Sequence, residues 1–135
     1  MIFLDTSAFI KRYIQEQGSD DVNNLCAHSD IALSALCLPE MMSALNRFKR
    51  ESILREKDYR SIKQDILEDI QDLHMMELSE EIVMMSVHCL EKSVLKASDS
   101  IHIATAVFVK ASLFVSADLQ QIKAAQLLGL VVKRI

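Results

Sequence analysis

Residues 2–7 read IFLDTS: a short apolar run that ends in an acid followed by two hydroxyl residues. Residues 113–118, LFVSAD, again pair an apolar run with an acid. Short apolar runs of this length are typical of buried strands in a parallel sheet. Longer stretches with the period of an amphipathic helix lie between such runs, and this alternation predicts an α/β domain with a mostly parallel sheet.

Working outward from these two stretches, we predict strands at residues 1–4, 31–34, 74–77, 113–116 and 131–133. We predict helices at residues 7–15, 20–28, 39–51, 56–72, 79–92, 99–110 and 119–128. Pro39 suits the first turn of its helix and Gly129 suits the end of the last one. The stretch 101–109 is apolar on almost every face, which predicts a central helix against the sheet.

The composition indicates one folded domain that spans residues 1–135. Half of the residues are apolar, a quarter are charged, and only two Gly and one Pro occur, so no linker is indicated. The first residues lack the basic segment of a signal peptide, and no apolar run approaches the roughly 20 residues that cross a bilayer. We therefore expect a soluble, cytoplasmic protein with no membrane partner. Three widely spaced cysteines favour reduced core thiols over a zinc site or a disulfide.

The net charge of −4 is unevenly distributed. Residues 47–63 hold seven basic and three acidic side chains, a local net charge of +4, whereas residues 65–81 hold seven acids and no Lys or Arg. The basic run is either a solvated helix face or a rim that contacts phosphates. In the second case Arg47, Lys49 and Arg50 would bind substrate.

Four acids lie where predicted strands end and predicted helices begin. Asp5 and Asp118 follow strands, Glu40 lies in the first turn of a helix, and Asp99 begins the apolar helix. Each acid by itself suits a helix N-terminus, and Gln121 even completes the pattern of a capping box with Asp118. Because ligands bind beyond the carboxyl ends of parallel strands, Asp5 and Asp118 are nevertheless expected at the likely functional edge.

A cluster of four carboxylates requires a counter-charge. Two carboxylates about 5 Å apart repel by roughly 3 kcal/mol at an effective dielectric constant of about 20. Raised pKa values or a bound cation must relieve this repulsion, and oxygen ligands without Cys suit Mg²⁺ or Mn²⁺. Such a site is suited to phosphodiester hydrolysis by a metal-activated water. No P-loop, GxGxxG or GxSxG motif is present, and a second Asp two residues after Asp5, which an aspartyl-phosphate phosphatase would need, is missing.

In order along the chain, the stretches at 2–7, 39–40, 97–106, 114–118 and 128–130 resemble those of the PIN-domain nucleases. In size and C-terminal sequence the chain is similar to the VapC-type toxins of toxin–antitoxin pairs. The resemblance implies a three-layer α/β/α fold with a five-stranded parallel sheet and about seven helices. It also implies Mg²⁺- or Mn²⁺-dependent endoribonuclease activity, a homodimer, and inhibition by a cognate antitoxin.

Carried over position by position, the resemblance assigns the catalytic metal site to Asp5, Glu40, Asp99 and Asp118. It matches Ser116, and Thr6 or Ser7, to hydroxyl residues that would hold a carboxylate or a metal-bound water. Ser116 stands where Thr is commoner and Ser100 where Ala is usual. His102 shares a helical face with Asp99, so it either reaches the metal or scissile phosphate or is a structural, hydrogen-bonded histidine.

Three functions are compatible with these residues. The first is a metal-dependent endoribonuclease that is toxic unless its antitoxin binds it. The second is a catalytically silent PIN-like module that binds RNA or a protein. The third is a structure-specific DNA nuclease with the same chemistry. The complete set of four acids favours an enzyme, because a silent module has no need of a self-repelling cluster.

Overall fold

Five parallel strands form a single sheet in the computed structural model, which describes residues 1–135. The strands are β1 (Ile2–Leu4), β2 (Ile31–Ser34), β3 (His74–Met76), β4 (Leu113–Ser116) and β5 (Val132–Arg134). Their order across the sheet is β3-β2-β1-β4-β5. Every neighbouring pair is parallel, so all five carboxyl ends lie at the same edge.

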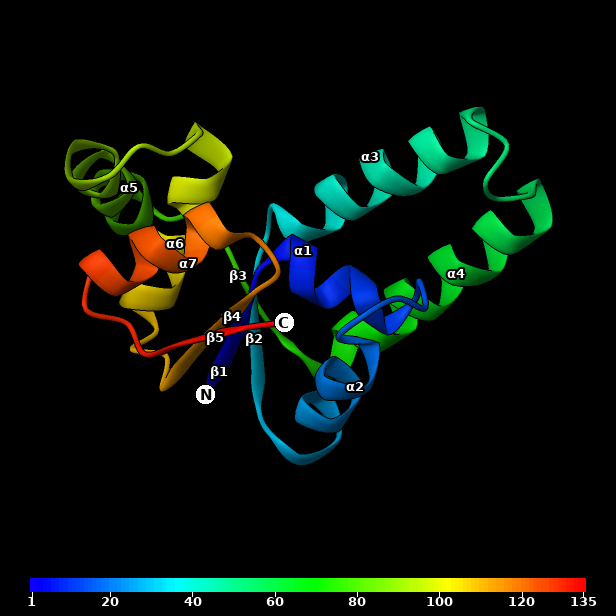
Figure 1. Cartoon of the computed structure of the whole chain (residues 1–135), viewed down its shortest axis with the longest axis horizontal. Helices are drawn as coiled ribbons and strands as arrows, with labels where there is room; N and C mark the ends of the chain where they lie inside the picture. Colours follow the sequence, from blue (N-terminus) through cyan, green and yellow to red (C-terminus); the bar gives the residue numbers. More distant parts are fainter.

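Helices cover both faces of the sheet (Figure 1). They are α1 (Thr6–Phe9), α2 (Ser19–His28), α3 (Cys37–Arg50), α4 (Glu56–Asp69), α5 (Glu80–Lys92), α6 (Ala97–Phe108) and α7 (Leu119–Leu127), with short 3₁₀ segments at Ile10–Arg12 and Ile70–Asp72. In Figure 1, α1 to α4 lie on one side of the strands and α5 to α7 on the other. The predicted three-layer α/β/α fold is confirmed. No helix combines the length and the hydropathy that a membrane-spanning helix needs.

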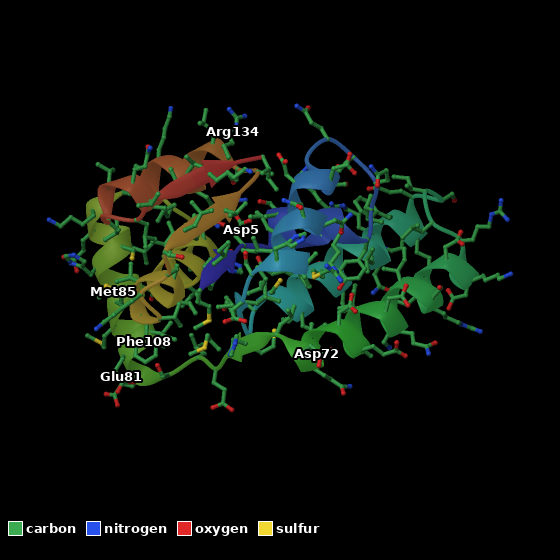
Figure 2. All side chains as sticks on the ribbon, turned by 90° about the horizontal axis from the view of Figure 1, so that it is seen from below. Asp5, Asp72, Glu81, Met85, Phe108 and Arg134 are labelled. Atoms are coloured by element: carbon green, nitrogen blue, oxygen red, sulfur yellow. The ribbon has the colours of Figure 1, made fainter.

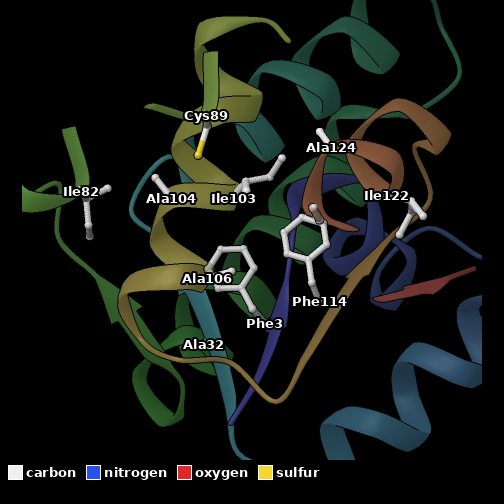
Figure 3. Packing of buried hydrophobic residues seen from close by; sticks show 11 residues of the cluster. Phe3, Ala32, Ile82, Cys89, Ile103, Ala104, Ala106, Phe114, Ile122 and Ala124 are labelled. Atoms are coloured by element: carbon white, nitrogen blue, oxygen red, sulfur yellow. The ribbon is translucent and has the colours of Figure 1, made fainter. Parts of the chain in front are cut away.

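Side-chain alternation along the strands creates two separate cores. Phe3 and Phe114 belong to the core shared with α5, α6 and α7, where their rings stack with centroids 5.7 Å apart (Figure 3). Leu4 and Val115, one residue further along each strand, belong to the core on the α1–α4 side. Successive strand residues point to opposite faces, so strands this short need apolar residues at nearly every position to bury both sides.

α3 and α4 form an antiparallel pair that extends away from the sheet (Figure 1). Asn46 donates a hydrogen bond of 2.9 Å to the hydroxyl of Tyr59, and the Lys49 ammonium lies 4.4 Å from the centre of the Tyr59 ring. Lys49 also forms a 3.1 Å ion pair with Glu56. These contacts fix the two helices to each other. We call the pair the α3–α4 arm, and the basic run at residues 47–63 lies within it.

Several predicted helix boundaries differ from the structure by a few residues, and two of these differences bear on the site. The first helix was expected at 7–15, but α1 ends at Phe9 and the 3₁₀ segment ends at Arg12. Beyond Arg12 the chain turns, and the Ser19 hydroxyl holds this turn by accepting from the Glu16 N–H and donating to the Ile14 carbonyl. The apolar helix was expected to begin at Asp99, but α6 begins at Ala97, which places Asp99 inside the first turn.

Candidate active site

The site lies where the strand order reverses direction. The chain builds β1, β2 and β3 outward to one side, then crosses back and adds β4 and β5 on the other side of β1. Helices that leave adjacent carboxyl ends on opposite faces open a crevice there, which is the usual ligand site of open α/β sheets. Asp5 follows β1 and Asp118 lies two residues beyond β4, so both acids flank this point.

A cleft of about 320 Å³ opens at this point of the sheet edge. All four acids singled out in the sequence line it, although they come from four separate segments of the chain. The remaining lining residues are Thr6, Ser7, Ile10, Ala44, Arg47, Phe48, His102 and Gln121. We call this the acidic cleft.

Asp5 is the most deeply buried of the four acids, with 2% of its surface exposed. It caps α1: its Oδ1 accepts from the Ala8 N–H at 3.0 Å and from the Ser7 hydroxyl at 2.7 Å. Its Oδ2 accepts from the Ser116 hydroxyl at 2.6 Å. Burial raises the pKa of this carboxyl above its ordinary value, although the hydrogen bonds from Ser116 and Ser7 act in the opposite direction.

Two serines connect the ends of β1 and β4. The Ser7 and Ser116 hydroxyl oxygens lie 3.2 Å apart, and each donates to one oxygen of Asp5. Ser7 also accepts from the Ala117 N–H, and Ser116 accepts from the Asp118 N–H, both at 3.0 Å. The hydroxyls therefore satisfy the backbone beyond β4 and fix where Asp118 stands relative to Asp5.

Glu40 lies in the first turn of α3 and is held from two sides. Its Oε1 accepts from the Thr6 hydroxyl at 2.7 Å and from the Nε2–H of His102. Burial alone would raise the pKa of Glu40, but the hydrogen bonds from His102 and Thr6 bring it below its ordinary value. Glu40 is thus stabilised as a carboxylate, whereas Asp5 is not.

His102 is 1% exposed and lies against Phe3, edge to face, with ring centroids 6.2 Å apart. Its Nε2 bonds to Glu40 and lies 3.3 Å from the Thr6 hydroxyl oxygen. Its Nδ1 is buried without a hydrogen-bond partner. One alternative from the sequence was a structural histidine held by a hydrogen bond. The bond from His102 to Glu40 is a contact of that kind.

Asp118 and Asp99 are connected by Gln121. Oδ1 of Asp118 caps α7 by accepting from the backbone N–H groups of Gln120 and Gln121 at 2.8 and 3.3 Å. A capping box would require the Gln121 side chain to return to the cap residue, but its Nε2 donates to Asp99 Oδ1 at 3.4 Å. Burial, then the charges of Asp118 and Glu40, raise the pKa of Asp99. The sequence analysis missed the contact between Gln121 and Asp99, because the capping-box pattern with Asp118 already explained a Gln at position 121.

The carboxylates suit a hard divalent cation by their chemistry and by their unused oxygens. Glu40 Oε2, Asp99 Oδ2 and Asp118 Oδ2 accept no hydrogen bond from the protein, while the other oxygen of each residue does. Mg²⁺ and Mn²⁺ prefer such ligands. In the structure, no three His, Cys, Asp or Glu side chains stand in an arrangement that would hold a metal ion.

The three basic candidates occupy different surroundings. Arg47 is exposed and lines the acidic cleft from α3. Lys49 faces Tyr59 and Glu56 within the α3–α4 arm, and neither Lys49 nor Arg50 lines the cleft. The structure therefore brings only Arg47 to the four acids.

Comparison with known proteins identifies the family to which this chain belongs. The model of the PIN domain matches residues 2–127, so the chain belongs to the PIN-domain family. Ribonuclease VapC45 of Mycobacterium tuberculosis (strain CDC 1551 / Oshkosh) is 28% identical over 110 residues, which are 81% of this chain and 76% of that protein.

Two solved structures share the fold. In the crystal structure of FitAcB from Neisseria gonorrhoeae, one chain superposes with a TM-score of 0.73 at 17% identity, covering 98% of this chain and 96% of that one. In a toxin-antitoxin complex from Klebsiella pneumoniae, the TM-score is 0.69 at 17% identity, covering 90% of each chain. At this level of identity the likeness establishes the common fold.

Neutralising Asp5 is expected to stabilise the metal-free protein. Because the folded pKa of Asp5 is raised, the ionised carboxylate costs stability at pH 7, and this cost disappears as the pH falls through the folded pKa. Asp5→Asn should raise Tm in EDTA at pH 7, by about 2–4 °C per kcal/mol relieved, and the gain should shrink as the pH is lowered.

The matched control for this thermal melt is Asp65→Asn, an exposed acid on α4 without hydrogen bonds to its side chain. It should leave Tm within about 1 °C. A lower Tm for Asp5→Asn than for the natural chain would show that the buried charge is already compensated.

His102 and Glu40 are expected to be energetically coupled. His102→Ala removes the donor to Glu40 and opens a cavity beside Phe3, so it should cost about 2–4 kcal/mol of unfolding free energy. His102→Gln keeps an N–H donor and should cost less.

Urea unfolding of His102→Ala, Glu40→Ala and the double variant measures the coupling directly. We expect an interaction energy of about 1–3 kcal/mol, since the two side chains are in contact. Strictly additive effects would contradict the assignment of His102 as the residue that holds Glu40.

Proposed function

We propose that this chain is a Mg²⁺- or Mn²⁺-dependent endoribonuclease that hydrolyses RNA phosphodiester bonds by a metal-activated water. One observation carries the proposal: four acids from separate segments converge in one cleft, and three of them keep a carboxylate oxygen free of protein hydrogen bonds. Membership of the PIN-domain family and the similarity to Ribonuclease VapC45 support it.

Asp5, Glu40, Asp99 and Asp118 would hold the ion. When bound, the ion would supply a water of lowered pKa and neutralise charge on the phosphate. The chain's own part is to present the ligands. Two serines orient Asp5, and Thr6 and His102 fix Glu40.

Gln121 on α7 and Arg47 on α3 also line the acidic cleft. Gln121 restrains Asp99 through the hydrogen bond to its Oδ1. Arg47, seven residues after Glu40 on α3, would bind an RNA phosphate at the rim of the cleft. Arg50 is exposed further along α3 and would contact a more distant phosphate, whereas the charge of Lys49 is already paired with Glu56.

We further propose that the protein is the toxin of a toxin–antitoxin pair, is inhibited by a cognate antitoxin, and forms a homodimer. The similarity to Ribonuclease VapC45 and to a chain of the Klebsiella pneumoniae toxin-antitoxin complex supports this. Exposed apolar side chains on α5 offer a surface for a protein contact: Met84, Val87 and Leu90 are 62%, 44% and 40% exposed.

A catalytically silent module is the second candidate, and the absence of a ready-made metal geometry is the observation in its favour. Against it stands the electrostatic cost of the cluster: after burial, the charges of Asp118 and Glu40 raise the pKa of Asp99. The third candidate, a DNA nuclease, is distinguished from a ribonuclease by comparing RNA and DNA substrates.

Purified protein is expected to cleave single-stranded RNA in Mn²⁺ and to be inactive in EDTA. Asp5→Asn should lower the rate by at least about 100-fold, since even the partners of metal ligands cost about 10–100-fold when removed. Because the same substitution should stabilise the apo fold, lost activity would not reflect unfolding.

A gel assay with matched RNA and DNA oligonucleotides checks these rates. Equal cleavage by the natural chain and Asp5→Asn would indicate a contaminating nuclease. Metal-dependent binding of RNA without cleavage would favour the silent module, and faster cleavage of DNA would favour the DNA nuclease.

A further inference from the structure

A second cleft, of about 480 Å³, adjoins the acidic cleft at the same sheet edge. It is lined by Lys11, Gln17, Ala117, Arg134 and Ile135. Ala117 stands between Ser116 and Asp118 in the chain, so one residue of backbone separates this cleft from the acids. We call it the basic cleft, because its only charged side chains are Lys11 and Arg134.

The wall of the basic cleft is tightly built around a buried lysine. Lys11 is 9% exposed, and its Nζ donates to the Gln17 carbonyl at 2.7 Å and to Glu16 Oε1 at 3.1 Å. Gly18 has φ of +92°, and a Cβ there would lie 3.2 Å from the Ile135 Cβ and 3.3 Å from the Lys11 Cδ. A glycine is therefore needed for the loop to close over Lys11 and the end of β5.

Arg134 is the cation that remains available in this cleft. Lys11 already faces Glu16, and Lys133 approaches Asp21 at 4.0 Å, but Arg134 is exposed and forms no ion pair. It pairs in register with Ser116, whose hydroxyl binds Asp5. Since neighbouring strands are about 4.8 Å apart, the Arg134 backbone lies one strand spacing from Ser116 and two from the end of β1.

The acids are flanked by one arginine on each side. Along the sheet, the order β2-β1-β4-β5 places Asp5 and Asp118 between α3, which follows β2, and the end of β5. Arg47 lines the acidic cleft from α3, and Arg134 lines the basic cleft from β5. Figure 2 shows Asp5 inside the molecule and Arg134 at its periphery. A polyanionic strand that crosses the acids would meet a guanidinium at either end.

We propose that the basic cleft binds a backbone phosphate of the RNA strand, next to the segment held at the four acids. Arg134 makes the contact, because a guanidinium presents paired N–H donors that match phosphate oxygens. Lys11, whose charge is paired with Glu16, anchors the wall through its contacts to Glu16 and Gln17. The inference rests on the proposed function and adds to it the direction in which the substrate extends, toward β5.

Binding without cleavage tests the proposal. We measure fluorescence anisotropy of a labelled 12-nucleotide RNA with the full chain in EDTA at low salt. Arg134→Gln should weaken binding several-fold and reduce the slope of log K against log salt by about 0.7, the value for one lost phosphate contact on a single strand. The matched control, Lys133→Gln, removes an equal charge one residue away that lies outside the cleft, and should leave the slope unchanged.

Equal affinity of Arg134→Gln and the natural chain, an equal loss in both variants, or no RNA binding by the natural chain would overturn the proposal. Titration with inorganic phosphate is the second arm. Phosphate binding that Arg134→Gln abolishes, with RNA affinity unchanged, would assign the cleft to a free anion and likewise overturn it.

Cleavage kinetics in Mn²⁺ separate this proposal from the nuclease itself. Arg134→Gln should raise KM several-fold and leave kcat within about twofold, because a contact remote from the reacting atoms contributes uniform binding. If the natural chain cleaves RNA and Arg134→Gln has the same KM, the phosphate subsite fails and the nuclease stands. If the natural chain never cleaves but Arg134→Gln alone weakens RNA binding, the nuclease fails and the subsite stands.

Discussion

Repulsion among carboxylates at one edge of a parallel sheet is the constraint on which this structure depends. Parallel pairing of β1 and β4 brings Asp5 and Asp118 to the same edge, and α3 and α6 add Glu40 and Asp99. Two carboxylates about 5 Å apart would repel by roughly 3 kcal/mol. Burial and the neighbouring acids together raise the pKa of Asp99, so the repulsion is not fully relieved within the protein.

The surrounding residues orient the acids more than they neutralise them. Asp5 receives donors on both oxygens and is nearly inaccessible, whereas Glu40, Asp99 and Asp118 are each held through one oxygen and keep the other unbonded. His102 is the one titratable side chain that bonds directly to an acid of the cleft. Hydroxyl, amide and backbone donors supply the remaining contacts. A rigid frame with unfilled oxygens is suited to a cation that brings its own charge.

Much of the fold could be predicted because local patterns and packing agree. Strands of three or four apolar residues can be buried on both faces only between two helical layers, and all five strands were found near their expected positions. Helix ends were harder to place. The first α-helix ends at Phe9 and is followed by a 3₁₀ segment and by a turn at residues 14–16 that Ser19 holds. No local pattern around residue 9 indicates this change.

The sequence by itself determined the layered α/β fold and the placement of Asp5 and Asp118, since an acid that follows a short apolar run is placed by chain geometry at the carboxyl edge. Glu40 and Asp99 could be identified as acids in the first turns of their helices. Only the tertiary structure decided which neutral groups hold those acids. The Ser7–Ser116 contact and the bond from Gln121 to Asp99 join residues 109 and 22 positions apart. The placement of Arg134 one strand from Ser116 was likewise fixed by the pairing of β4 with β5. Such partners depend on strand order and register, which arise from the packing of the whole chain.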